Sequence, residues 1–126
     1  MLKLCLAYIS VVIFSSALAN VTLAGEVDVL NVEVQSTGAD RYHIAVTVQH
    51  DDTGWDHYSN AWEVLDEKGA LMGVRVLHHP HVNEQPFTRS LTITIPSAVK
   101  KITLRGKDSI HAYGGKVVEV EMPPSL

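Results

Sequence analysis

The feature that most constrains this chain is the alternation of apolar and polar residues that runs through most of it after residue 25. Side chains on a β-strand point alternately to opposite faces, so an apolar residue at every second position marks a strand with one face in the core. The clearest example is RYHIAVTVQH, with Tyr42, Ile44, Val46 and Val48 in step. No convincing helix pattern follows residue 25. The pattern predicts an all-β fold.

Seven stretches carry this pattern, and turn signals separate them. The tight turn DEKGA joins the third stretch to the fourth, Pro96 ends the fifth, and Gly114-Gly115 precedes the seventh. Short strands at this spacing, with a tryptophan in the third, are typical of an immunoglobulin-like antiparallel β-sandwich. A small β-barrel is the alternative. We expect the strands at about 26–35, 41–50, 59–66, 71–77, 87–95, 100–107 and 118–122.

The alternation also assigns residues to faces. Leu30, Val32 and Val34 should share the inward face of the first strand. In the third strand, Trp62 and Val64 should point into the core.

The first residues have the layout of a secretory signal peptide and stand apart from this domain. The stretch MLKLCLAYISVVIFSSALA has one lysine, then an apolar run, then the small residues Ala17-Leu18-Ala19. A transmembrane anchor is the alternative, but the unbroken apolar run is short for crossing a bilayer. We expect a signal peptide over 1–19, with cleavage as late as 24, and one β-sandwich domain over 25–126.

Cleavage would change the chemistry that the chain offers. The single cysteine, Cys5, would leave, so the mature domain would have no disulfide and no thiolate ligand. Lys3 would leave as well, so the ten basic residues become nine against fourteen acidic ones, a net charge of −5 with histidine neutral. That balance disfavours nucleic acid and anionic membrane surfaces as partners. We expect a periplasmic or secreted protein with no stable membrane anchor after cleavage.

All seven histidines remain in the mature domain, and six of them fall on loops at one end. In an antiparallel sandwich the connections after the second, fourth and sixth strands share an end. His43 starts the second strand at the opposite end, and we expect no role for it. The six histidines of the shared end are His50, His57, His78, His79, His81 and His111.

Side-chain alternation brings further polar groups to the same end. Continuing the inward face of the second strand past Val48 reaches His50, and that of the sixth past Leu104 reaches Asp108. In the fifth strand the inward set reaches Arg89. An inward arginine needs an anion. The candidates are Asp52, Asp56, Glu84 and Asp108.

The segment HHPH has a local geometry of its own. Pro80 favours an extended conformation for His79. His79 and His81 should then project to the same side and His78 to the other. We therefore expect His79 and His81 to be a pair of ligands, with His78 as a weaker candidate.

Three loops that deliver imidazoles to one place predict a transition-metal site. Copper or zinc fits these ligands best, and iron also fits. Nearby carboxylates would orient the rings. The predicted ligands are His50, His57, His79, His81 and His111, and the predicted supporting or ligand-binding residues are His78, Asp52, Asp56, Glu84, Arg89 and Asp108. The expected partners are the metal ion and another periplasmic protein.

The alternative function is a metal-free module that binds a protein or a small molecule. Loops on a rigid sandwich commonly carry recognition. Arg89, Trp55 and the acidic loops would then make the contacts. No nucleophilic triad or elbow is recognisable, so the sequence does not decide whether the chain is an enzyme.

The chain also resembles the superoxide reductase (desulfoferrodoxin-type) domain over roughly residues 44–115. It has His50, then Asp56-His57-Tyr58, then AWEVLDEKG, and finally Asp108-Ser109-Ile110-His111. The resemblance implies an immunoglobulin-like sandwich with an iron site at one end, and His50, His57 and His111 as ligands. That family has a cysteine thiolate where this chain has Asp108, so the resemblance does not extend to the reaction with superoxide. The chain otherwise looks like the small exported bacterial proteins, which adds localisation and no mechanism.

Overall fold

The computed structural model describes residues 25–126, in which seven β-strands and no helix form. The predicted signal peptide, 1–19 with cleavage as late as 24, lies outside the described residues. The strands lie close to their expected positions. They are β1 (Asp28–Gly38), β2 (Arg41–Gln49), β3 (Ser59–Leu65), β4 (Leu71–Val76), β5 (Phe87–Thr94), β6 (Lys101–Asp108) and β7 (Val118–Glu121).

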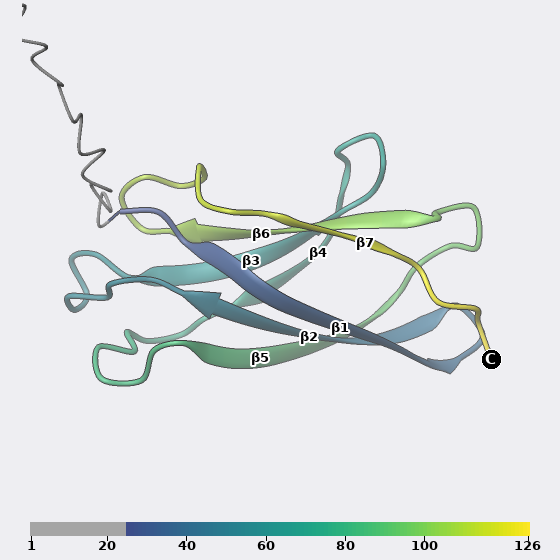
Figure 1. Cartoon of the computed structure of the whole chain (residues 1–126), viewed down its shortest axis with the longest axis horizontal. Coiled ribbons are helices and arrows are strands. Elements are labelled where there is room, and N and C mark those ends of the chain that lie inside the picture. The colour runs from purple at the N-terminus through teal and green to yellow at the C-terminus, as the bar shows by residue number, and fades with distance from the viewer. Residues whose placement is uncertain (1–24) are drawn as a thin grey trace, which may run out of the picture.

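The strands form two antiparallel sheets that pack face to face (Figure 1). The first sheet has the order β1-β2-β5 and the second the order β4-β3-β6-β7. The chain therefore crosses between the sheets after β2, β4 and β5. The predicted immunoglobulin-like sandwich is confirmed, and the alternative of a small barrel is wrong because the two sheets are separate.

The core consists of the inward side chains of both sheets, as the alternation predicts. Burial repeats at every second residue of β2 and β6. The same parity continues to the strand ends, where His50 and Asp108 are buried and Arg89 is partly exposed. Side chains with no exposed surface include Ile44, Val46, Trp62, Val64 and Leu104.

The first strand departs from its expected parity. Val29 is fully buried, whereas Leu30 is 42% exposed, so the expected inward position of Leu30 is wrong. The reason is a register shift, since Val29 pairs with Val48 and Asn31 with Thr47, which leaves Leu30 as an extra residue. Such a β-bulge reverses the faces on its two sides.

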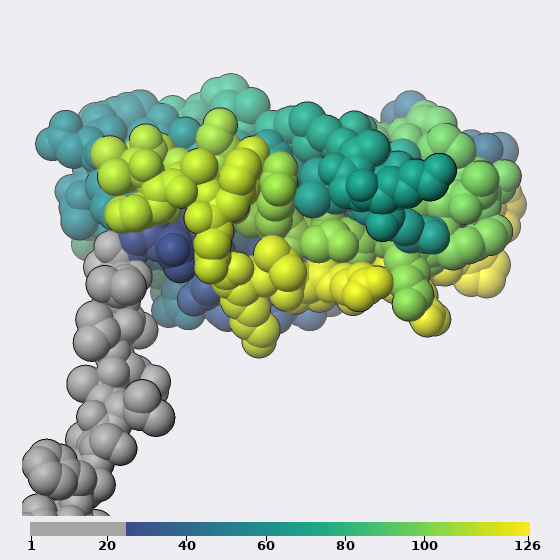
Figure 2. Space-filling model, turned by 90° about the horizontal axis from the view of Figure 1, so that it is seen from above, coloured from purple at the N-terminus to yellow at the C-terminus, as the bar shows by residue number. Residues whose placement is uncertain are grey.

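Three loops and the beginning of the described chain lie at one end of the sandwich (Figure 1). Hydrogen bonds tie them together, from Ser109 N to Tyr58 O and from Val29 N to Lys116 O. Figure 2 shows the β6–β7 loop, in yellow-green, next to the first described residues, in purple. Within residues 25–126 no helix has the length and apolar character needed to cross a membrane.

Candidate metal centre

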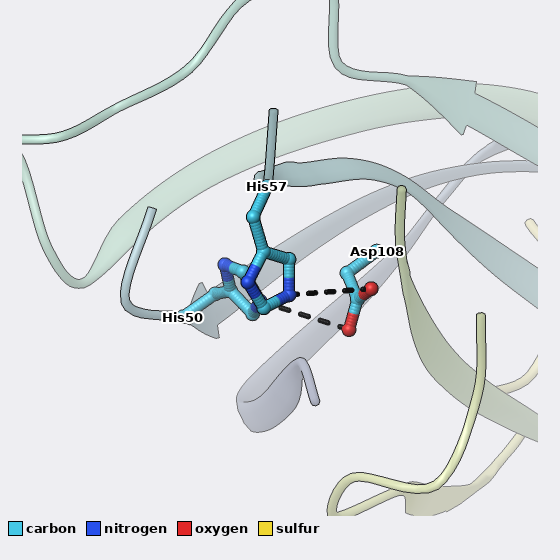
Figure 3. A group of neighbouring side chains, drawn as sticks. All are labelled: His50, His57 and Asp108. Carbon is cyan, nitrogen blue, oxygen red and sulfur yellow. Dashed lines mark ion pairs between the residues drawn. The ribbon is translucent and has the colours of Figure 1, made fainter. Parts of the chain in front are cut away.

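Three side chains from three places in the sequence converge at this end (Figure 3). His50 directly follows β2, His57 lies in the β2–β3 loop, and Asp108 is the last residue of β6. One ligand atom of each residue lies within 4.8 Å of those of the other two. The inner group, as we call these three residues, gathers because strand parity turns both His50 and Asp108 toward the core.

The ring of His50 is held by the carboxylate of Asp52. His50 is 3% exposed, and its Nδ1 lies 2.5 Å from Asp52 Oδ1. Asp52 is fixed in turn, because its oxygens accept hydrogen bonds from the backbone N–H of Ser59 at 3.0 Å and of His81 at 2.8 Å. A carboxylate at Nδ1 places the proton of a neutral imidazole there and leaves the lone pair on Nε2. Nε2 of His50 faces Asp108, at 3.7 Å from Oδ2.

Asp108 presents one free carboxylate oxygen to the two imidazoles. Its Oδ1 accepts hydrogen bonds from the backbone N–H of Ile110 and His111, at 2.8 and 2.5 Å. Its Oδ2 is buried and has no hydrogen-bond partner among the described residues. Leaving a buried carboxylate oxygen without a partner is costly. The oxygen is therefore a position where a cation would be stabilised.

His57 and His111 complete the polar wall. Nε2 of His57 lies 3.5 Å from Asp108 Oδ1, and Nδ1 of His111 lies 3.5 Å from Asp108 Oδ2. The His57 ring contacts both neighbouring imidazoles, with centroids 4.9 Å from His50 and 5.0 Å from His111. The side chain of His57 is 18% exposed and that of His111 is 44% exposed, so His111 lies at the rim.

The spacing of these donors suits a metal ion. Bonds of about 2.1 Å in tetrahedral geometry put neighbouring ligand atoms about 3.4 Å apart. Asp108 Oδ2 lies 3.7 Å from Nε2 of His50 and 3.5 Å from Nδ1 of His111. Nε2 of His57 lies 3.5 Å from the other oxygen of the same carboxylate, Oδ1. Imidazole nitrogen with carboxylate oxygen is a donor set for Zn(II), Cu(II) or Fe(II).

A second histidine group lies on the other side of Asp52. The rings of His79 and His81 lie 4.5 Å apart, in agreement with the expectation that they project to the same side. His81 also stacks on Phe87, with centroids 3.9 Å apart. Its Nε2 lies 3.0 Å from a guanidinium nitrogen of Arg89, which donates the hydrogen bond. We call His79, His81 and Arg89 the outer group.

Burial lowers the pKa of His81 below its ordinary value of 6.5, and the neighbouring charges of His79 and Arg89 lower it further. A neutral His81 that accepts from Arg89 at Nε2 carries its proton on Nδ1, which is buried and has no partner within residues 25–126. A metal ion at Nε2 would have to displace a cationic guanidinium. The structure therefore gives His79 and His81 different neighbours from the inner group, and their service as ligands stays a prediction.

The remaining predicted residues are scattered around the two groups. Glu84 forms an ion pair with Arg89, with 3.7 Å between Glu84 Oε1 and Arg89 Nη2. Asp56 and His78 are exposed. His43 lies in β2 with Nδ1 3.2 Å from Thr92 Oγ1, away from the loop end, as expected.

One functional group was not expected from the sequence. The backbone carbonyl oxygen of Gly25 lies 3.3 Å from Nε2 of His50 and 3.3 Å from Nε2 of His57. Every residue has a main-chain carbonyl oxygen, so the residue type does not show which of them lies in a site. Asp108 was expected among the supporting or ligand-binding residues and not among the metal ligands, although strand parity placed it beside His50.

Comparison with known proteins finds a chain that is similar over most of this one. No protein-family model and no solved structure matches this chain. It is 40% identical over 96 residues to a protein of Halomicrobium mukohataei described as "Putative lipoprotein". The match covers 76% of this chain and 47% of that protein, so the chain spans about half the length of this relative. The resemblance to the superoxide reductase domain stays a prediction.

Proposed function

We propose that this chain is an exported protein that binds one transition-metal ion through Nε2 of His50, Nε2 of His57 and Oδ2 of Asp108. Nδ1 of His111 stands beside them as a further ligand. The observation that carries the proposal is the buried Asp108 oxygen, which has no donor of its own and faces imidazole nitrogens. A divalent cation would satisfy it and draw all these donors together.

The donor set decides which ions are expected. Two or three imidazoles with one carboxylate favour Cu(II) and Zn(II), and Fe(II) is also accommodated. Soft Cu(I) is disfavoured because the site has no sulfur among these residues. The reaction with superoxide is not part of the proposal, since Asp108 supplies a hard oxygen where the resembled family has a thiolate.

Export is supported by two observations. The first residues have the layout of a signal peptide. The similar protein of Halomicrobium mukohataei is described as a lipoprotein, and lipoproteins are exported. The periplasm or the cell exterior is the proposed location, where the site would carry or sense a metal ion.

The test is metal analysis of the exported protein, followed by calorimetric titration with Zn(II) and with Cu(II). We expect one ion per chain. His57→Ala should weaken binding strongly, because it removes one proposed ligand. The His57 side chain is partly exposed, so its loss should leave the core intact. His43→Ala is the matched control on the opposite end. No metal in the protein and no heat with either ion would contradict the proposal.

A second candidate is a metal-free binding module. It is favoured by Trp55, which is 67% exposed in the β2–β3 loop with Tyr58 edge-on at 5.5 Å. Ile110 of the β6–β7 loop is also exposed. Exposed aromatic and aliphatic side chains on loops are typical of contact surfaces. If the titrations show no metal, Trp55→Ala is the variant with which to test this function.

A further inference from the structure

We propose that the backbone carbonyl oxygen of Gly25 is a ligand of the same ion, so that the segment 25–27 closes the metal centre. This inference rests on the proposed function and adds a ligand that no side chain supplies. Gly25 O lies 3.3 Å from Nε2 of both His50 and His57. Those separations are close to the tetrahedral ligand spacing of about 3.4 Å. The oxygen thus stands at a vertex that the three side chains leave open.

The groups at this place attract positive charge. Nε2 of His50 faces two oxygens, Gly25 O at 3.3 Å and Asp108 Oδ2 at 3.7 Å, while Asp52 holds Nδ1 of the same ring. Without a metal, an N–H on Nε2 donates to Gly25 O. A divalent ion would replace that proton and bind the nitrogen together with the oxygens. Carbonyl and carboxylate oxygens with imidazole are suitable donors for a divalent ion.

The residue type at position 25 fits a need for close approach. A Cβ atom at Gly25 would lie 2.8 Å from Cε1 and 3.0 Å from Nδ1 of His111. Glycine at this position therefore lets the segment and the ring of His111 approach each other closely.

The segment is held in place from both sides. Val27 is 1% exposed in the core, and Val29 N donates to Lys116 O at 2.8 Å. Gly115 of the β6–β7 loop packs directly against the segment, and a Cβ atom at this position would lie 1.9 Å from Val27 O. The residues that follow Gly25 are therefore held in place, which restricts where its carbonyl oxygen can lie.

One peptide bond reports directly on this carbonyl. Gly25-Glu26 is the only Gly-Glu pair in the sequence. In the exported protein labelled with carbonyl-¹³C glycine and ¹⁵N glutamate, a carbonyl-to-nitrogen correlation NMR spectrum contains a single signal from it. We expect Zn(II) to shift the Gly25 carbonyl carbon in step with the ring signals of His50 and His57. Ring signals that shift while the Gly25 carbonyl stays in place would overturn this inference and leave the proposed function standing. If no signal shifts, the proposed function fails as well.

A pair of glycine variants gives an independent readout. Gly25→Ala should weaken Zn(II) binding by about tenfold, because the added methyl group forces the carbonyl and the His111 ring apart. Gly38→Ala is the control, since nothing lies within 4 Å of a Cβ atom there. Equal affinities of the two variants would contradict a role of Gly25 in the centre.

Discussion

Two histidine groups lie at the same end of this sandwich and differ in the charge that a neighbouring strand brings to them. In the inner group, β6 ends in the carboxylate of Asp108, which faces His50 and His57. In the outer group, β5 places the guanidinium of Arg89 against His81. Imidazoles beside an anion attract a cation, and imidazoles beside a cation repel one. Histidine density alone therefore does not make a metal site.

The largest expected effect comes from removing the anion of the inner group. In Asp108→Asn the amide oxygen still accepts the N–H groups of Ile110 and His111, so the turn is preserved. The amide nitrogen then points a donor where the free oxygen was. Losing a residue that only supports a ligand lowers metal affinity by at most about 100-fold. Because Asp108 is itself a proposed ligand, we expect a larger loss of affinity. Calorimetric titration measures this, and thermal unfolding without metal should show no loss of stability. Undiminished affinity would mean that the ion is not bound at Asp108.

The next largest difference is expected between one histidine of the inner group and one of the outer group, each replaced by alanine. His57→Ala should cost about 2 kcal/mol or more of metal-binding free energy, and His79→Ala less than about 0.5. Both side chains are partly or largely exposed, so neither change creates a core cavity. Equal losses in parallel titrations would show that the outer group binds the ion, as the sequence predicts for His79 and His81.

Asp52→Asn should affect both groups at once, because this carboxylate joins them. Its Oδ1 meets His50 Nδ1, and its Oδ2 accepts from the backbone of His81. The NH2 group of the asparagine would face either Nδ1 of His50 or the backbone N–H of His81, where the aspartate has an accepting oxygen. We expect a loss of about 1–3 kcal/mol in the free energy of unfolding and about tenfold in metal affinity. Denaturant unfolding without metal and titration with Zn(II) separate the two. A change in stability with unaltered affinity would mean that Asp52 does not orient His50.

The smallest effect is a pH dependence of stability from the outer group. The folded-state pKa of His81 lies below 6.5, so the unfolded chain takes up this proton more readily. The stability that neutral His81 contributes is therefore complete above pH 6.5 and is lost as the pH falls through the lowered pKa. His79, Arg89, Glu84 and Asp52 surround the ring and stay unchanged in His81→Gln.

The measurement compares unfolding of the two proteins at about pH 7.5 and about pH 5.5 in metal-free buffer. We expect the wild type to lose more stability than His81→Gln between these values. Parallel losses in both proteins would assign the acid sensitivity to other groups and remove this contrast between the inner and outer groups.

The sequence predicts the strands well, and it also predicts the inward positions of His50 and Asp108. Alternation fixes which residues of β2 and β6 face inward, and this parity carries His50 and Asp108 into the core. The alternation could not predict the hydrogen bond from Arg89 to His81, because the partner of a long side chain depends on the tertiary structure around it. The carbonyl of Gly25 was out of reach for another reason, since backbone atoms are the same at every residue.

The extra residue Leu30 makes the proposed metal centre depend on the length of the chain. Deleting one residue there would leave every proposed ligand in the sequence and would preserve the pairing of β1 from Asn31 onward. It would nevertheless turn the preceding residues over, which takes Val27 out of the core and Gly25 away from His57. A relative that keeps every histidine of this end but lacks that single residue would then have lost the centre. Alignment gaps in β1 would thus carry as much information about the proposed site as the identities of its side chains.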